Sequence, residues 1–270
     1  MIPAPCVTVC IPVYNGAKYL RACLESLAVQ QWAPIEVIVC DDCSEDNSLD
    51  IAKDAAARHN HIRWVIQASD SRLGMVANWN RCIALATGVF VKVMGQDDIL
   101  ADGCLSHQAQ ILSKDGAVLT ACQRYLLSED GKRSFALPRK LPFGQLQRED
   151  IIFDFLHKGR NPIGEPVTVL FRADAFNKSG GGFNPRYLYW VDVEMWFRLL
   201  KHGSCHISSK HLCSFRIHRN AMSFSCQNIS LSEFLSLRAE IAGAGTSSLR
   251  AASHVIADTI GRSLIYKLFA

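Results

Sequence analysis

Strands and amphipathic helices alternate regularly over residues 7–94. Four short apolar runs rich in β-branched residues are typical of strands covered on both faces: Val7–Val13, Ile35–Cys40, Ile62–Gln67 and Val89–Met94. Between them, apolar residues recur at helical spacing over Gly16 to about Val29, Ser44 to about Ala57 and Met75 to Ala86. This alternation predicts βαβ units, and therefore an α/β fold with a mostly parallel sheet flanked by helices.

Capping residues predict two helix boundaries. Ser44 is expected to cap the helix that ends near Ala57, because its hydroxyl can accept hydrogen bonds from unpaired main-chain N–H groups. Asp41 is also suited to capping this helix. Gly203 is expected to end a helix that begins at Val191, because glycine is favoured directly after the last helical turn.

The alternation ends near Phe135, where a loop rich in proline and lysine begins. A helix, a strand over Pro166–Arg172 and a loop with the three glycines Gly180–Gly182 follow, and the glycine composition suits a mobile lid. No Gly/Ser linker divides the chain. We therefore expect one domain over residues 1–225, with a regular half (1–115) and an irregular α+β half (116–225), and a helical extension over 226–270.

Charge and cysteine content exclude several classes of protein. The net charge of +4 comes from 29 basic and 25 acidic residues that are scattered along the chain, so nucleic acid is not an expected partner. No apolar segment reaches the length of a membrane span, and the N-terminus lacks the pattern of a signal peptide. Eleven cysteines without an export signal predict a reducing, cytoplasmic location.

Cys40 and Cys43 form a C-x-x-C pattern, which occurs in thiol redox sites and in zinc sites. A zinc site needs a second pair of ligands at matching spacing, and the sequence has none. Between the two thiols stand Asp41 and Asp42, whose negative charge raises a thiol pKa and disfavours a reactive thiolate. We interpret these cysteines as incidental to function.

Polar residues follow the strands where parallel sheets bind ligands. Tyr14–Gly16 follow the first strand, Asp41 and Asp42 the second, and Gln96–Asp98 the fourth. The last pair of carboxylates offers hard oxygen ligands for Mg²⁺ or Mn²⁺ that bridges to phosphates, although an isolated pair of this kind is more often a solvated turn. Only one glycine follows the first strand, so the G-x-G-x-x-G pattern of a nicotinamide or flavin enzyme is absent.

Four segments, taken in order, resemble family 2 glycosyltransferases with the GT-A fold. They are "IPVYNGAKYL" (Ile11–Leu20), "VIVCDDCSEDNS" (Val37–Ser48), "SRLGMVANWNRCIALATG" (Ser71–Gly88) and "GQDDIL" (Gly95–Leu100). The resemblance continues through "GEPVTVLFR" to "RIHRNAMS", from roughly Val7 to Ser223. It implies an inverting enzyme that moves a sugar from a nucleotide-diphosphate sugar, with a UDP-sugar favoured, to an acceptor hydroxyl. Residues 1–115 would then bind the nucleotide and residues 116–225 the acceptor.

The resemblance also implies roles on the donor side. The expected contacts of the nucleoside are Pro12, Val13, Tyr14 and Asp42. Asp97 and Asp98 match the family's D-x-D-type motif, with Asp98 on the divalent cation (Mn²⁺ or Mg²⁺) and Asp97 toward the ribose. His218, in "FRIHRNAMS", is implied as a ligand of the metal or of the diphosphate.

Two positions depart from the family pattern on this side. Trp79 stands where many members carry an arginine that can pair with the diphosphate, and Arg72 or Arg81 is our candidate to replace it. Cys43 stands where the family commonly has glycine. The resemblance therefore implies that the C-x-x-C pattern of Cys40 and Cys43 belongs to a nucleotide-binding loop with an unusual thiol.

On the acceptor side, "WVDVEMWFR" resembles the family's E-D-x-x-x-W stretch, which makes Asp192 the expected general base. Val191 replaces the usual glutamate. Glu194 is the second choice, although it lies on a different helical face. Glu165 is expected near the acceptor, and Trp190 is either a platform for a sugar ring or part of the core.

The partners follow from the same resemblance. The acceptor is expected to be a saccharide or a lipid-linked saccharide, in the assembly of cell-surface polysaccharide or glycolipid. A C-terminal apolar stripe predicts packing on the domain or on a second subunit, with peripheral membrane contact as the alternative: Val255, Ile256, Ile260, Leu264, Ile265 and Leu268. Two further alternatives are a non-catalytic nucleotide-sugar binding protein of the same fold and a nucleotidyltransferase, whose Gly-rich N-terminal loop is absent.

Overall fold

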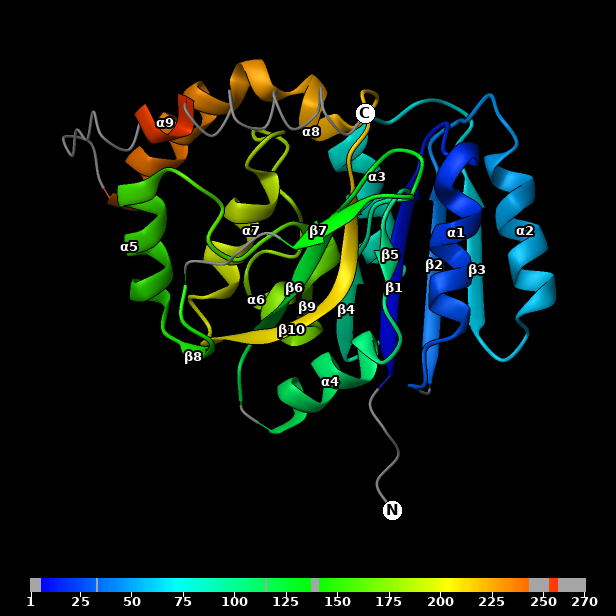
Figure 1. Cartoon of the computed structure of the whole chain (residues 1–270), viewed down its shortest axis with the longest axis horizontal. Coiled ribbons are helices and arrows are strands. Elements are labelled where there is room, and N and C mark those ends of the chain that lie inside the picture. The colour runs from blue at the N-terminus through cyan, green and yellow to red at the C-terminus, as the bar shows by residue number, and fades with distance from the viewer. Residues whose placement is uncertain (1–5, 33, 115, 137–140, 243–252, 257–270) are drawn as a thin grey trace.

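The architecture comes from a computed structural model that describes residues 6–32, 34–114, 116–136, 141–242 and 253–256. In the first half, strands and helices alternate as predicted (Figure 1). The elements are β1 (Val7–Val13), α1 (Ala17–Ala28), β2 (Ile35–Asp41), α2 (Ser48–Arg58), β3 (Arg63–Ala68), α3 (Met75–Ala84), β4 (Phe90–Val93), β5 (Ile99–Leu100) and α4 (Cys104–Lys114).

The second half mixes short strands with helices and loops. Its elements are β6 (Leu119–Leu127), β7 (Ser134–Ala136), β8 (Gly144–Leu146), α5 (Arg148–Lys158), the 3₁₀ turn Pro166–Thr168, β9 (Val169–Arg172), α6 (Ala173–Lys178), α7 (Val191–Leu199), β10 (Cys205–Arg216), α8 (Met222–Ser225), the 3₁₀ turn Gln227–Ile229 and α9 (Ser230–Ala242). The strand predicted over Pro166–Arg172 therefore begins three residues late, after a turn that proline favours at its start.

One sheet connects both halves, in the order β3-β2-β1-β4-β9-β6-β10-β5, with β7 on β6 and β8 on β10. Strands β3, β2, β1 and β4 are parallel to one another. Strand β9 is antiparallel to both β4 and β6, and β10 is parallel to β6. The predicted fold class is confirmed, and every antiparallel pair of this sheet includes a strand of the second half.

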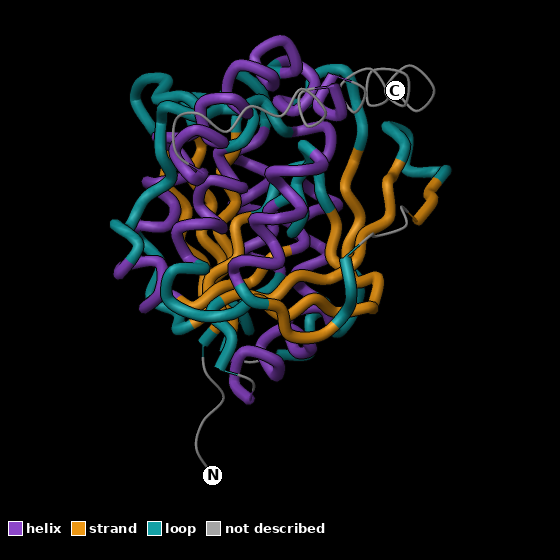
Figure 2. Tube along the Cα trace, turned by 90° about the vertical axis from the view of Figure 1, so that its left-hand side faces the viewer, coloured by secondary structure: helices purple, strands orange, loops and turns teal. Residues whose placement is uncertain are grey.

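Two layers of helices cover the sheet. Alternate residues of a strand point to opposite faces, and because the strands are apolar on both faces, each face is covered by helices. Val9 and Ile11 of β1 pack with apolar residues of α1, α2 and α4, whereas Cys10 packs with those of α3, α5 and α7. In Figure 2, which is seen from the side of α5 and α9, helices lie in front of the strands. Lys92 of β4 is fully buried and donates from Nζ to the carbonyls of Val167 (2.7 Å) and Val169 (2.9 Å), which ties the two halves together.

Two predicted helix caps are wrong, the N-terminal cap of α2 and the C-terminal cap of α7. Helix α2 begins at Ser48, because Ser44 lies in a preceding turn where its main-chain N–H donates to Asp41 Oδ2 (2.9 Å) and its hydroxyl accepts the N–H of Asn15 (2.9 Å). Asp41 therefore stabilises that turn instead of capping the helix. Helix α7 ends at Leu199, and Gly203 is required by packing, since a Cβ there would lie 2.6 Å from Cγ1 of Val118.

The predicted C-terminal extension is described in part. Helix α9 packs on the main core through Phe234 and Leu237, and Val255 is buried while Ile256 is exposed. The remainder of the predicted apolar stripe, over 257–270, lies outside the described residues, and so does the dimer contact expected there. Within the described residues, none of the helices is both long enough and apolar enough to span a membrane.

Candidate active site

A cavity of about 490 Å³ opens beyond the carboxyl ends of β1, β2 and β4, which is where ligands bind in parallel sheets. Its walls include the ends of these strands, α3, the segment 161–166, the start of α7 and the chain after β10. The cavity brings together nearly all predicted site residues: Pro12, Val13, Tyr14, Asp42, Arg72, Trp79, Asp97, Asp98, Glu165, Trp190, Asp192 and His218. Glu194 and Arg81 do not line it.

The two carboxylates after β4 fold back over Gly95. A Cβ at Gly95 would lie 2.6 Å from Oδ1 of Asp97 and 3.0 Å from Oδ2 of Asp98, so a side chain at this position would displace these carboxylates. Asp98 is buried, and its Oδ1 accepts the main-chain N–H of Arg216 (3.1 Å). Burial, together with the negative charge of Asp97, raises the pKa of Asp98 well above its usual range.

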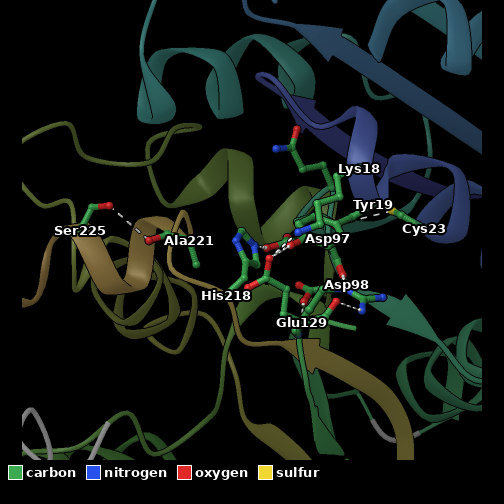
Figure 3. Close-up of polar contacts among 12 residues, drawn as sticks. Lys18, Tyr19, Cys23, Asp97, Asp98, Glu129, His218, Ala221 and Ser225 are labelled. Carbon is green, nitrogen blue, oxygen red and sulfur yellow. Dashed lines mark hydrogen bonds and ion pairs between the residues drawn. The ribbon is translucent and has the colours of Figure 1, made fainter. Parts of the chain in front are cut away.

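His218 is held against this pair (Figure 3). Its Nε2 is 2.7 Å from Oδ2 of Asp97, and its ring centroid is 4.7 Å from that of Tyr19. The Tyr19 hydroxyl donates to Glu129 (3.1 Å), which also forms an ion pair with Lys18. His218, two residues after the end of β10, therefore contacts the loop after β4 and belongs to a network that joins both halves of the chain.

The loop after β1 is fixed by a residue that the motif comparison did not single out. The Gln96 side chain accepts the N–H of Tyr14 (2.9 Å) and donates to its carbonyl (2.9 Å). Gly16 permits this approach, because a Cβ there would lie 2.3 Å from Gln96 Oε1. The guanidinium carbon of Arg72 lies 3.9 Å from the centroid of the Tyr14 ring, a cation–π contact that places Arg72 on the cavity wall.

Asp42 is buried and lines the cavity, but its carboxylate is already engaged. Oδ1 accepts the N–H of Leu73 (2.6 Å) and Oδ2 that of Gly74 (2.9 Å), which fixes the chain entering α3. Arg81 of α3 points elsewhere, donating to the carbonyl of Ala68 (2.8 Å). Of the two predicted replacements for the missing family arginine, Arg72 reaches the cavity and Arg81 does not. Trp79 lines the cavity wall and packs edge-to-face on Phe183, with the ring centroids 5.1 Å apart.

Asp192 lies in the first turn of α7, where the helix dipole favours a negative charge. It is buried, its Oδ1 accepts the N–H of Val193 (2.8 Å), and its Oδ2 accepts the side-chain N–H of Asn161 (2.9 Å). Sequence reasoning missed Asn161, because no local pattern shows that residue 161 folds onto a helix that begins at residue 191.

The other residues predicted for the base or for the acceptor side have structural partners. Glu194 forms an ion pair with Arg198 (2.7 Å), and Arg198 also donates to the carbonyl of Ser179 (2.6 Å), which holds the three-glycine loop in place. Glu165 pairs with Arg124 (2.7 Å) at the cavity wall. Trp190 is buried and donates from Nε1 to the carbonyl of Ser230 (2.7 Å), as expected for a core residue that borders the cavity.

The cysteines carry no disulfide or metal cluster. All eleven are free thiols. A hydrogen bond with Cys82 and burial raise the pKa of the Cys40 thiol far above its usual range. Cys43 is exposed and has a left-handed φ of 60°, a backbone conformation that favours glycine. Among the described side chains, no group of three or more His, Cys, Asp or Glu residues is arranged to hold a metal ion by itself.

Comparison with known proteins decides the family. The model of glycosyl transferase family 2 matches residues 8–180. The chain belongs to glycosyltransferase family 2. An uncharacterized glycosyltransferase of Rickettsia typhi is 25% identical over 217 residues, which are 80% of this chain and 65% of that protein. The chain thus spans about two thirds of the length of this relative.

Solved structures confirm the GT-A fold. TarS of S. aureus, in complex with UDP-GlcNAc, has a TM-score of 0.70 at 18% identity, over 97% of this chain and 73% of that one. The mannosyltransferase PcManGT of Pyrobaculum calidifontis, in complex with GDP-Man and Mn²⁺, has a TM-score of 0.65 at 16% identity, over 98% of this chain and 74% of that one. The family 2 enzyme described here is therefore a glycosyltransferase with the same fold as these two proteins.

Proposed function

We propose that the enzyme transfers a sugar, with inversion, from a nucleotide-diphosphate sugar to an acceptor hydroxyl. One observation carries the proposal: Asp97 and Asp98 after β4, and Asp192 at the start of α7, border the same cavity although they come from opposite halves of the chain. In this proposal, Asp97 and Asp98 mark the position of the anionic leaving group, and Asp192 is the base for the incoming hydroxyl in the same cavity.

In this mechanism the acceptor hydroxyl attacks the anomeric carbon from the side opposite to the diphosphate. Asp192 takes the hydroxyl proton as general base, a contribution typically of about 10²–10⁴ in rate. A single displacement from the opposite face inverts the anomeric configuration, by the same geometry as in inverting glycosidases.

The carboxylates after β4 fit a divalent cation, Mn²⁺ or Mg²⁺. Burial and a neighbouring carboxylate disfavour the ionised form of Asp98, so a cation at this site offsets an unfavourable charge. Asp98 and Asp97 would hold the cation, with His218 beside them, and oxygens of the donor's phosphates would complete its ligands, as is common for Mg²⁺. When bound, the cation supplies charge neutralisation for the departing diphosphate.

For the donor we favour a UDP-sugar. The support is the similarity to TarS, which was solved with UDP and with UDP-GlcNAc, although PcManGT was solved with GDP-Man. Pro12, Val13, Tyr14 and Arg72 form the wall expected to contact the nucleoside. Since both oxygens of Asp42 accept main-chain N–H groups, Asp42 would shape this end of the cavity in addition to any contact with the ribose.

The acceptor side is proposed from the family resemblance. A saccharide or lipid-linked saccharide would enter past Glu165 and Trp190, in the assembly of cell-surface polysaccharide or glycolipid, at or near the cytoplasmic face of the membrane. The division into a domain over 1–225 and an extension over 226–270 belongs to the same proposal, with the extension contributing to membrane contact or to a homodimer.

Thermal unfolding with nucleotides tests the donor site. We expect UDP with Mn²⁺ to raise Tm, and GDP, dTDP or CMP to raise it less, because a ligand stabilises the state that binds it. Asp98→Asn should abolish the dependence on Mn²⁺ while the protein stays folded. If no nucleotide shifts the Tm of the folded wild-type protein, with or without Mn²⁺, the proposed donor site is wrong.

A further inference from the structure

Asn161 is oriented by hydrogen bonds on both ends of its side-chain amide. Its Oδ1 accepts the main-chain N–H groups of Ile163 (3.1 Å) and Gly164 (2.8 Å), and its Nδ2 donates to Oδ2 of Asp192 (2.9 Å). A flipped amide would turn its N–H groups toward two main-chain donors, so the oxygen is held on the loop and the donor on the carboxylate.

The segment that carries Asn161 is attached to α7 at a second point. The indole N–H of Trp196, which is fully buried, donates to the carbonyl of Gly164 (3.2 Å). Gly164 has a φ of 122°, which side chains with a Cβ rarely adopt, and a Cβ there would lie 2.6 Å from Oγ1 of Thr168. Two contacts one helical turn apart, at residues 192 and 196, therefore keep the loop in register with the start of the helix.

The Asp192 carboxylate is thus bound at both oxygens, by the amide of its own helix on Oδ1 and by Asn161 on Oδ2. Asp192 and Asn161 line the same cavity, so this hydrogen bond is formed at the cavity wall. Hydrogen bonds to the ionised form favour that form, and a neutral donor does so without cancelling the charge as an arginine would.

We propose that Asn161 is a positioning residue that holds Asp192 ionised and turned toward the acceptor hydroxyl. The inference rests on the proposed function, because it presupposes that Asp192 is the base. It predicts that the identity of residue 161 sets the proton affinity of Asp192 without changing how the donor binds.

Other charged groups near Asp192 keep their own partners in the test variants. The titratable and charged groups around the same cavity and on the elements packed against this turn are Tyr14, Asp42, Arg72, Asp97, Asp98, Glu165 with Arg124, Tyr189, His218, Glu233 of α9, Glu194 with Arg198 on α7, and Asp154 and Lys158 of α5 with Arg160. A change at residue 161 alone leaves all of these in place.

Two variants separate positioning from support of the loop. In Asn161→Asp, the carboxylate can still accept from Ile163 and Gly164, but it faces Asp192 with a negative charge in place of a donor. In Asn161→Ser, the hydroxyl can accept from the same turn but is too short to reach Asp192. Asn184→Asp is the matched control, since Asn184 also caps a turn, accepting the N–H of Arg186 (3.1 Å), and does not line the cavity.

The direct measurement is the titration of the Asp192 carboxyl by ¹³C NMR, with its resonance assigned as the one missing from the Asp192→Asn spectrum. We expect Asn161→Asp to raise this pKa by about 1 unit or more and Asn161→Ser to raise it by less, while Asn184→Asp leaves it in place. An Asp192 pKa that is the same in the wild type and in both residue 161 variants would overturn the inference.

Turnover provides the second readout, with UDP release from UDP-GlcNAc in the presence of Mn²⁺ as the assay. Asn161→Asp should move the acidic limb of the kcat pH profile to higher pH, by the same amount as the Asp192 pKa, and leave the donor KM nearly unchanged. If the wild-type enzyme releases no nucleotide from UDP-, GDP- or dTDP-sugars, the proposed function fails, whereas the NMR titration still decides whether Asn161 governs Asp192.

Discussion

The two sides of the cavity are built in different ways. On the proposed donor side, apart from the contact of His218 with Asp97, polar side chains bind main-chain groups of neighbouring loops, as Asp42 does with Leu73 and Gly74, and Gln96 with Tyr14. On the proposed acceptor side, side chains also form ion pairs with one another, Arg124–Glu165 at the cavity wall and Glu194–Arg198 outside the cavity. The contacts of the proposed donor side are therefore mainly with the main chain of loops, whereas buried ion pairs support the proposed acceptor side.

The largest effect on stability is expected where such a pair is broken. In Arg198→Ala, the buried Glu194 carboxylate loses its partner, and the carbonyls of Ser179 and Gly182 lose a donor. Breaking a buried ion pair on one side typically costs about 3–5 kcal/mol in the free energy of unfolding. Urea denaturation of the purified variant measures this change.

Arg186→Ala is the control for this prediction, because Arg186 pairs with Glu240 at the surface, where its side chain is 62% exposed. An exposed ion pair is worth roughly 0–1 kcal/mol, so this variant should unfold close to the wild type. Equal destabilisation in the two variants would contradict the view that the acceptor side rests on buried pairs.

On the donor side, a glycine should matter for ligand binding more than for stability. Gly95→Ala places a Cβ 2.6 Å from Oδ1 of Asp97, and the carboxylate can move aside at little cost to the fold. We expect the Mn²⁺-dependent affinity for UDP, measured by calorimetry, to fall about tenfold, which corresponds to roughly 1.4 kcal/mol.

Gly182→Ala serves as the comparison, since its nearest atom, Oδ1 of Asn80, would lie at an ordinary 3.5 Å. Its UDP affinity should match that of the wild type. Unchanged binding in Gly95→Ala would show that the position of the two carboxylates is not what the donor requires.

The smallest expected effect is a gain in stability at Cys43. Its φ of 60° costs a residue with a Cβ roughly 1–2 kcal/mol, and part of the benefit of glycine is lost to the greater freedom of the unfolded chain. Cys43→Gly should therefore raise the free energy of unfolding by about 0.5–1 kcal/mol. Cys43→Ser keeps the Cβ and should leave it unchanged, so a gain in both variants would point to the thiol instead of the backbone.

The difference between the two sides of the cavity also explains how much of the structure the sequence could predict. The strands of the first half, their parallel direction and the convergence of Tyr14, Asp42, Asp97 and Asp98 follow from apolar periodicity and from the rule that strand ends meet at one edge. The caps at Ser44 and Gly203 were wrong, because a turn contact with Asn15 and packing on Val118 outweigh the local preferences of serine and glycine.

The acceptor side was harder to predict for a physical reason. Asn161 and Asp192 are 31 positions apart in the sequence, and Glu165 and Arg124 are 41 positions apart. No repeated spacing in the sequence predicts either contact. The family motif predicts Asp192 as the base, and the structure shows what surrounds this residue. The second-choice base, Glu194, has its carboxylate on Arg198, outside the cavity.

The most direct test of the account is the turnover of Asp192→Asn. We would measure UDP release from the UDP-sugar that stabilises the protein most, with Mn²⁺ present, together with the dissociation constant for UDP. The account predicts that kcat falls by about 10²–10⁴ while the affinity for UDP stays within a factor of about two, because the base acts on the acceptor and not on the nucleotide. Wild-type turnover in this variant would contradict the role of Asp192 and with it the proposed mechanism.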